Sequence, residues 1–227
     1  MKNLSLSALL LAGACLTQPA VAKISDLLPL PKQVVAVEQT PFNLQRSVRL
    51  TDPTSCALLQ TVLTEAGATL SDDASATVTV EIVSEIPGAF NHSVNLFPDE
   101  AYSLDISSDA VVIRALNATG VIRAAQTLRQ LAEGYEEGSA AFECLQLSDW
   151  PAFKVRGFMH DVGRSFLSFD ELKREIDNLS RFKVNVFHWH LTEKLAWRFE
   201  VKAYPQLTAA DNITRYPGQF YTQDQCR

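Results

Sequence analysis

The sequence predicts an α/β protein in which a small α+β domain precedes the first strand–helix–strand unit of a parallel sheet. Up to about residue 148, short runs with the period of a β-strand alternate with two helical patterns. After Asp149-Trp150-Pro151, two apolar runs at 155–162 and 184–191 flank one amphipathic helix, with short connections. A strand, a helix and a strand joined in this way form a parallel βαβ unit with a right-handed crossover.

The first 22 residues have the pattern of a secretory signal peptide. An apolar stretch from Leu4 to Cys15 is followed by Ala20-Val21-Ala22, which fits an A-x-A cleavage site. The stretch is too short for the roughly 20 residues of a membrane-spanning helix. The sequence therefore predicts export to the periplasm or beyond the cell. In an alternative interpretation, Cys15 after Ala12-Gly13-Ala14 carries a lipid, as in an outer-membrane lipoprotein.

Composition narrows the possible partners of the chain. The net charge of −6 comes with no basic stripe, so no nucleic-acid partner is predicted. After residue 22 only Cys56, Cys144 and Cys226 remain, and we expect buried or free thiols rather than a disulfide framework or a zinc site. No cofactor and no further membrane segment are predicted, and the sequence does not indicate an oligomeric state.

Residues 23–150 are predicted to form the α+β domain. The pattern gives an amphipathic helix over 56–66, a strand over 77–83, and a hairpin of 102–106 with 111–115. A second helix is expected over about 119–132. Asn117 would cap its start, and Gly134 would end it.

Residues 151–227 are predicted to begin a second domain. Ser168 and Glu171 form a capping box for its helix. One face of this helix carries Leu172, Ile176, Leu179 and Phe182. Thr222 has the position of a cap for a further helix. Parallel strands are normally buried on both faces, and two of them cannot enclose a core, so we expect the chain to be truncated.

Polar residues gather where the two predicted strands end. Asp161 and Arg164 follow the first strand, and His188 and His190 share one face near the carboxyl end of the second. Ligands of parallel α/β folds bind at this end. Glu193 comes just after and can neutralise Arg164 or join it in holding a ligand. The planar fork of arginine suits adjacent hydroxyl groups, which favours a carbohydrate.

Other interpretations of these residues remain open. His188 is as consistent with a core histidine as with a site residue. A metal site would need ligands beyond His188-Trp189-His190, and only His92 and His160 remain as histidines, so no metal is predicted. We expect Trp189 to pack on the opposite face of the strand. Trp197 fits either packing or stacking on a sugar.

Two long segments resemble glycoside hydrolase family 20, the β-N-acetylhexosaminidases. VRGFMHDVGRSFLSFDELKREIDNLSRFKVNVFHWHLTEKLAWRFEVKAYPQLT looks like the opening of the family's catalytic barrel. The preceding EAYSLDISSDAVVIRALNATGVIRAAQTLRQL resembles the small N-terminal domain. Together the likeness covers most of residues 25–227, and Phe220-Tyr221-Thr222-Gln223 resembles the start of the helix after the second barrel strand.

The resemblance implies a (β/α)8 barrel and a retaining exo-hydrolase. Such enzymes remove terminal N-acetylglucosamine or N-acetylgalactosamine from glycans, with the acetamido oxygen of the sugar as nucleophile. A glutamate acts as general acid, and the aspartate before it orients the acetamide. In the family this Asp-Glu pair follows strand four, so it is expected beyond residue 227 and no catalytic residue is assigned here. Asp99-Glu100 and Asp170-Glu171 cannot replace it, because they lie in the small domain and at a helix cap.

Four residues match positions of the family's site. Arg164 matches the arginine that holds sugar hydroxyls, and Asp161 and His190 match residues that we assign only to support of the site. Glu193 stands where many members have aspartate, so it is assigned to support with a carboxylate one methylene further out. Ser165 stands where many members have histidine.

Two alternatives to a hydrolase of this family remain open. The chain would be a non-catalytic sugar-binding remnant if a true stop follows Arg227. It would be a metal-dependent barrel hydrolase if His188 and His190 bound zinc.

Overall fold

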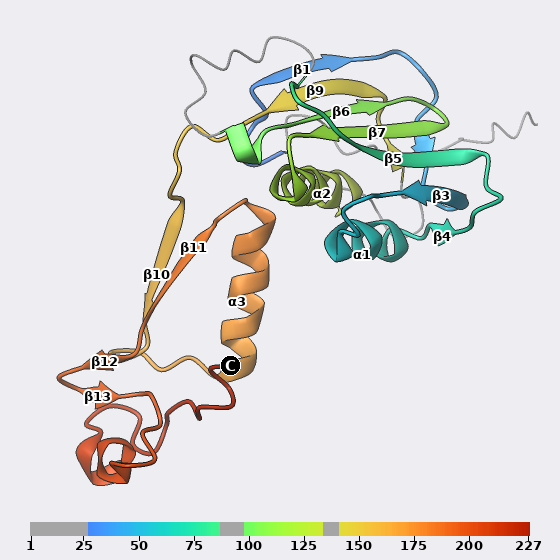
Figure 1. The fold of residues 1–227 in the computed structure, drawn as a ribbon. Coiled ribbons are helices and arrows are strands. Elements are labelled where there is room, and N and C mark those ends of the chain that lie inside the picture. The colour runs from blue at the N-terminus through green and yellow to red at the C-terminus, as the bar shows by residue number, and fades with distance from the viewer. Residues whose placement is uncertain (1–26, 87–97, 134–140) are drawn as a thin grey trace, which may run out of the picture.

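The computed structural model describes residues 27–86, 98–133 and 141–227. The first domain is built on a seven-stranded sheet (Figure 1). In spatial order its strands are β1 (Gln33–Ala36), β9 (Leu145–Asp149), β6 (Tyr102–Ile106), β7 (Ala110–Ala115), β5 (Ala76–Ile82), β3 (Ser47–Thr51) and β4 (Thr69–Leu70). A separate short pair joins β2 (Phe42–Asn43) to β8 (Ala141–Phe142). The predicted signal peptide, Cys15 and Gly134 lie outside the described residues.

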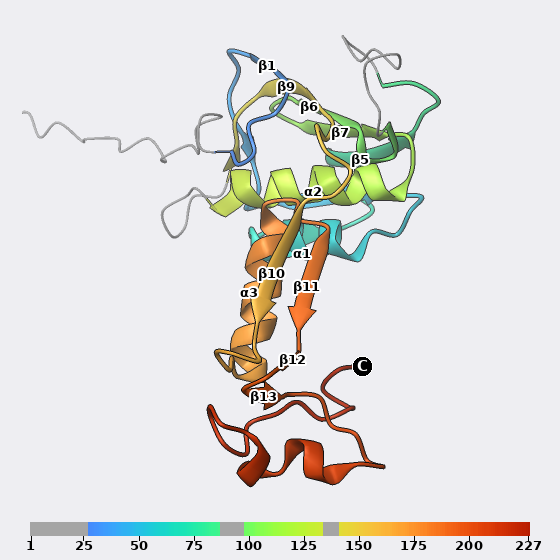
Figure 2. The same ribbon diagram turned by 90° about the vertical axis from the view of Figure 1, so that its left-hand side faces the viewer.

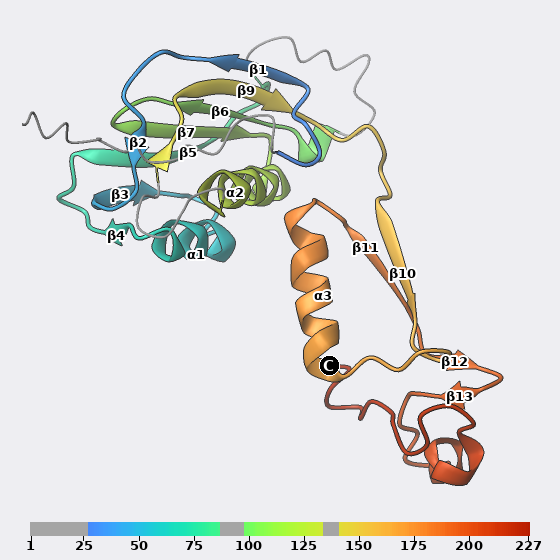
Figure 3. The ribbon, with the colours of Figure 1, turned by 180° about the vertical axis from the view of Figure 1, so that it is seen from behind.

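Two helices cover one face of this sheet, as Figures 1 and 3 show. They are α1 (Ala57–Glu65) and α2 (Ala118–Glu133). Alternate residues of the central strands face them and are buried, among them Val78, Leu104, Val111 and Ile113. The predicted first helix, strand, hairpin and second helix are therefore confirmed, and Asn117 Oδ1 accepts a hydrogen bond from Thr119 N at 2.8 Å.

The second domain begins with the expected parallel unit. It comprises β10 (Gly157–Asp161), α3 (Phe169–Arg181) and β11 (Val186–His190), with β10 and β11 paired in parallel. Both bonds of the predicted Ser168–Glu171 capping box are present. The strands begin later than predicted. Before β11, Lys183 adopts the left-handed region with φ 61° and makes a turn.

Only one face of β10 and β11 is covered in the described structure. One face packs towards α3, where Phe187, Trp189 and Leu191 contact a core that contains Leu172. The other face exposes Met159, Val186 and His188. Ile176 of α3 and Phe182, which caps the end of that helix, are exposed as well. The physical reason is that this sheet contains only β10 and β11 among the described residues, so a sheet face and part of the helix have no covering layer.

The segment after β11 contains a small hairpin. This hairpin pairs β12 (Thr192–Glu193) with β13 (Ala196–Trp197). Two short 3₁₀ helices follow at Pro205–Thr208 and Ala210–Asn212. Thr222 caps the turn at 223–226, since Gln225 N donates to its Oγ1 at 3.2 Å.

Buried charges join the two domains. Lys183, next to β11, inserts its ammonium group into the first domain, where Nζ lies 2.7 Å from Asp149 Oδ2 and donates to the Tyr102 hydroxyl at 2.8 Å. Beside it, Glu100 accepts hydrogen bonds from Arg123 Nε at 2.6 Å and from Arg156 Nη2. Because each carboxylate has a cationic partner, the junction can exclude water without stranding a charge.

A hollow of about 220 Å³ lies beside this junction rather than at the strand ends. Its walls combine the paired charges with apolar side chains, including Pro29, Leu30, Trp150, Pro151 and Phe153. Lys183, Asp149, Glu100 and both arginines already bind one another, so the hollow offers no evident chemistry. We regard it as part of the domain junction.

The cysteine prediction is confirmed for the described residues. Cys56 and Cys144 are buried, Cys226 is partly buried, and all three are free thiols. Within the described ranges, no helix combines the length and the apolar character needed to cross a membrane.

Replacing Glu100 by glutamine should weaken the domain junction at neutral pH. Burial raises the pKa of the Glu100 carboxyl, but hydrogen bonds from Arg156 and Arg123 outweigh it and hold the pKa below the usual 4.5. The stabilisation is therefore present above pH 4.5 and is lost as the pH falls through the lower pKa of the folded state. We expect Glu100→Gln to lower the free energy of unfolding by about 2 kcal/mol at pH 7 and by much less at low pH.

Urea unfolding of the purified chain at several pH values measures this difference. Glu65→Gln, at an exposed position on α1, is the matched control and should leave the free energy of unfolding unchanged. An equal loss at pH 7 and at pH 3 would show that the Glu100 carboxylate does not provide the stabilisation.

Candidate functional site

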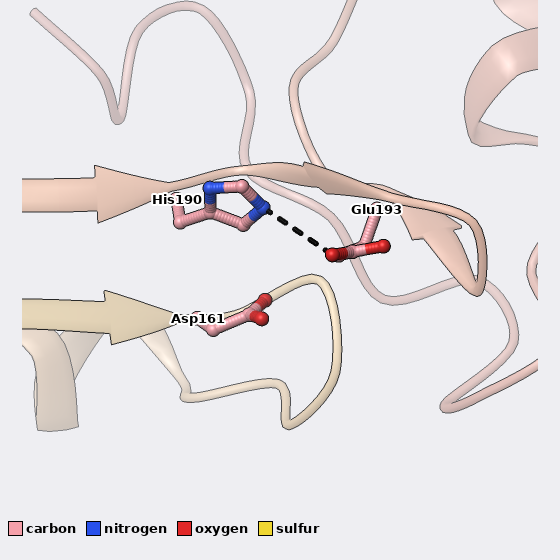
Figure 4. Close-up of side chains that lie close together, drawn as sticks. All are labelled: Asp161, His190 and Glu193. Carbon is pink, nitrogen blue, oxygen red and sulfur yellow. Dashed lines mark ion pairs between the residues drawn. The ribbon is translucent and has the colours of Figure 1, made fainter.

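The predicted polar residues meet at the carboxyl ends of β10 and β11. Asp161 is the last residue of β10, His190 is the last residue of β11, and the two are direct partners in the parallel register. Glu193 lies three residues on, in β12. Figure 4 shows the side chains of Asp161, His190 and Glu193 converging on one space beyond the strand ends. The pairing of the strands thus brings together residues about 30 positions apart in the sequence.

Arg164 closes this group from the turn after β10. Its Nε lies 3.0 Å from Asp161 Oδ2, and its Nη2 donates to Glu193 Oε1 at 2.9 Å. Asp161 also fixes the turn, because its Oδ1 accepts from the Arg164 backbone N at 3.1 Å. The Arg164 side chain remains 63% exposed, so its guanidinium borders both carboxylates and open solvent.

A glycine makes this close approach possible. A Cβ atom on Gly163 would lie 2.7 Å from Glu193 Cβ and 3.1 Å from Asp161 Oδ1. Real carbon atoms do not approach so closely, so any other residue would push the turn away from Glu193. Gly163 was not among the predicted site residues. Its place between Asp161 and Arg164 is the one signal that was available.

The ion pair between Arg164 and Glu193 shifts the pKa values of both side chains. The hydrogen bond from Arg164 is the largest cause that lowers the pKa of Glu193, and the backbone N–H of Lys194 adds to it. Glu193 in turn raises the pKa of Arg164. His190 Nε2 lies 3.9 Å from Glu193 Oε1, drawn as the dashed line in Figure 4, and this buried atom has no hydrogen-bond partner among the described residues.

Asp161, His190 and Glu193 also form a grouping that could in principle hold a cation. Their ligand atoms all lie within 4.8 Å of one another. The two carboxylates predicted at these strand ends thus both lie next to His190. Arg164 already supplies the positive charge, however, at 2.9 and 3.0 Å from the two carboxylates. A metal ion would have to displace that guanidinium.

The remaining candidates lie around this cluster. His188 is exposed on the same strand face, and its ring centroid lies 5.8 Å from that of His190. Trp197 is exposed on β13 and donates from Nε1 to Phe199 O at 2.7 Å. Ser165 N donates to Asp161 O, which closes the turn. Trp189 packs edge-on against Tyr221 at 4.6 Å between ring centroids, as expected for the face turned away from the site.

This arrangement suits a neutral ligand rich in hydroxyl groups. The exposed guanidinium donates, and the carboxylates of Asp161 and Glu193 accept, so adjacent hydroxyls can bind to both kinds of group. Because one arginine faces two carboxylates, the cluster has no excess positive charge that would favour an anion.

Comparison with protein families places the chain among the glycoside hydrolases. The model for domain 2 of glycosyl hydrolase family 20 matches residues 25–150, which is more than half of the chain. The model for the catalytic domain of the same family matches residues 153–227. The chain therefore belongs to glycosyl hydrolase family 20, as the sequence resemblance implied.

Individual relatives are named as hexosaminidases. A beta-hexosaminidase of Porphyromonas gingivalis is 34% identical over 229 residues, covering 92% of this chain and 28% of the relative. A beta-N-acetylhexosaminidase of Cellulomonas fimi is 39% identical over 130 residues, covering 56% of this chain and 26% of the relative. The chain thus spans little more than a quarter of the length of these relatives.

Solved structures match the arrangement of both domains. The β-N-acetylhexosaminidase of Bacteroides fragilis aligns with a TM-score of 0.66 at 28% identity, over 87% of this chain and 40% of that one. An exo β-N-acetylglucosaminidase of Vibrio harveyi, solved with N-acetylglucosamine, aligns with a TM-score of 0.67 at 27% identity, over 92% and 34%. The β10–α3–β11 unit accordingly corresponds to part of a barrel.

The ion pair at the strand ends can be tested by titration. Replacing Arg164 by alanine removes the main cause of the low pKa of Glu193, so we expect that pKa to rise towards its usual 4.5. Carbon-13 NMR of the labelled side-chain carboxyl measures it directly. Lys194→Ala is the control, because it removes a neighbouring charge and keeps the backbone N–H that binds Glu193. An unchanged pKa of Glu193 in Arg164→Ala would mean that the pair does not form in solution.

Proposed function

We propose that this chain is the N-terminal part of an exo-acting β-N-acetylhexosaminidase. The enzyme would hydrolyse terminal N-acetylglucosamine or N-acetylgalactosamine residues of glycans, with retention of configuration. The observation that carries the proposal is the Arg164 cluster at the carboxyl ends of β10 and β11, in a chain that two models of one hydrolase family match in sequence. The names of the relatives support the substrate class.

Arg164 is the proposed sugar-binding residue. Its exposed guanidinium offers paired N–H donors to adjacent hydroxyls of the terminal sugar. Asp161 and Glu193 hold that guanidinium from two sides, so its direction is set before the sugar arrives. Preorganisation of this kind reduces the entropy lost on binding. His190, whose Nε2 lies 3.9 Å from Glu193 Oε1, would support the site.

The proposed reaction is substrate-assisted, a known exception to the two-carboxylate scheme of glycosidases. The acetamido oxygen of the sugar attacks the anomeric carbon while a glutamate protonates the leaving oxygen. The intramolecular nucleophile gains the rate advantage of proximity. Arg164 would contribute by fixing the ring relative to the catalytic acid.

We further propose that residues 1–227 do not catalyse this reaction without the acid. Neither Asp-Glu pair of the chain is placed to serve. Glu100 is bound by two arginines at the domain junction, and Glu171 is occupied by the capping box with Ser168. Glu100 binds Arg156, which precedes β10, so it lies at the end of that strand opposite the Arg164 cluster.

Activity assays decide between the hydrolase and a sugar-binding remnant. The gene is read beyond codon 227, and the complete reading frame is expressed and assayed with a chromogenic N-acetyl-β-glucosaminide. We expect a downstream Asp-Glu pair, hydrolysis, and a fall in kcat/KM of about 100-fold in Arg164→Lys, which loses the paired donors. A stop after Arg227 and a folded, inactive product that binds N-acetylglucosamine would favour the remnant instead.

The pattern of residues 1–22 supports the proposal that the enzyme is exported. Mass spectrometry of the mature protein distinguishes cleavage of a signal peptide from lipidation of Cys15. Cleavage after Ala22 gives a free N-terminus, whereas a lipidated Cys15 retains residues 15–22 and adds acyl chains.

A further inference from the structure

We propose that Arg198 is the positioning residue of the sugar site, because it fixes the turn that presents Arg164. The inference rests on the proposed function and concerns the same site. Arg198 follows β13 and is not itself near open solvent, so it cannot touch a sugar. It acts through the backbone of the strand end.

The burial of Arg198 is unusual for a charged residue. Its exposed fraction is 0%, and it is the bulkiest of the fully buried side chains in the described residues. Arginine remains protonated at any ordinary pH, so a full positive charge lies inside the protein. A buried charge of this kind requires several hydrogen-bond acceptors.

The acceptors are backbone carbonyls. Nε donates to Val162 O at 3.0 Å, Nη2 donates to Arg215 O at 2.7 Å, and Nη1 donates to Gln219 O at 2.7 Å and to Tyr216 O at 3.2 Å. The guanidinium also lies over the Phe166 ring at 5.4 Å from its centroid. One planar group therefore ties the end of β10 to the 215–219 segment.

The contact with Val162 transmits this anchoring to the site. Val162 lies between Asp161 and the Gly163–Arg164 turn and is itself buried. The backbone of Arg198 adds two bonds, since its N donates to Leu191 O at 2.9 Å and its O accepts from Tyr221 N at 2.7 Å. The same residue thus holds the ends of both strands that carry Asp161 and His190. Figure 2 shows β12 and β13 beyond the carboxyl ends of these strands.

Anchoring the turn in this way requires an arginine, and another cationic side chain would not replace it. Its fork reaches three segments of backbone in one plane, whereas the ammonium of a lysine is a single point. Arg198→Lys keeps the charge and loses the fixed directions. The turn would then sample positions in which Arg164 no longer lines up with Glu193, and misplacement by about 1 Å can cost as much as 100-fold in rate.

A double-mutant cycle on the complete enzyme tests the inference. Arg198→Lys, Arg164→Lys and the double variant are compared by kcat, KM, the inhibition constant of N-acetylglucosamine and the melting temperature. We expect Arg198→Lys to weaken inhibition by the sugar by about tenfold, and to do so by less than about twofold when Arg164 is already lysine. A residue that only stabilised the fold would lower the melting temperature and leave the inhibition constant unchanged.

A second pair of variants covers the case in which Arg198→Lys does not fold. Gly218 has φ 75° with nothing within 4 Å of an added Cβ, so Gly218→Ala strains only the backbone that supplies the Tyr216 and Gln219 carbonyls. Gly67→Ala places a similar strain, at φ 100°, in a turn of the first domain and is the matched control. We expect the sugar to inhibit Gly218→Ala about threefold less strongly and Gly67→Ala unchanged.

The outcomes separate the two proposals. If Arg164→Lys leaves the inhibition constant unchanged, the proposed role of Arg164, and with it the proposed function of this site, is wrong. If Arg164→Lys weakens inhibition while Gly218→Ala and every folded Arg198 variant match the wild type, the sugar site stands and the positioning role of Arg198 is overturned. Additive effects of Arg198→Lys and Arg164→Lys would overturn it as well.

Discussion

The parallel pairing of β10 with β11 is the constraint on which the candidate site depends. The register sets Asp161 opposite His190, and both strands end there. A shift of one residue would turn the histidines towards α3 and bring Trp189 to the site face. Trp189 packs against Tyr221, and Phe187 packs against the same apolar core. Apolar packing on one face of the strands therefore fixes the polar geometry on the other face.

Electrostatics fixes both ends of this unit. At the amino ends of the strands, Lys183 and Arg156 bind Asp149 and Glu100 of the first domain. At the carboxyl ends, Arg164 binds Asp161 and Glu193, and Arg198 binds backbone carbonyls. A two-stranded sheet is weak by itself. The charges at each end therefore hold the unit in a position that its own small core does not determine.

The two arginines of the second domain illustrate different uses of one side chain. Arg164 lies in solvent with two carboxylates, so it can exchange partners when hydroxyl groups arrive. Arg198 lies fully buried among carbonyls and has no reason to exchange them. A buried cation that is fully hydrogen-bonded stiffens its surroundings, because any movement leaves a charge without an acceptor.

The site was only partly predictable for physical reasons that differ from residue to residue. Asp161, Arg164 and His190 were identified because polar residues at the ends of two apolar strands must share an edge. Gly163 was missed, since a close contact between Cβ positions depends on the path of β12, which the sequence did not reveal. Arg198 appeared only as part of a motif, because carbonyl acceptors carry no side-chain signal in a sequence.

The amino-acid sequence by itself determined the helices, the hairpin of β6 and β7, the parallel unit and the family, since hydrophobic period and capping residues act over short distances. Only the tertiary structure decided which faces of β10 and β11 are covered, how Lys183 crosses into the first domain, and that Arg164 binds Glu193. These contacts join residues that are 29 to 34 positions apart. These contacts depend on packing and charge pairing in three dimensions, which local sequence patterns do not specify.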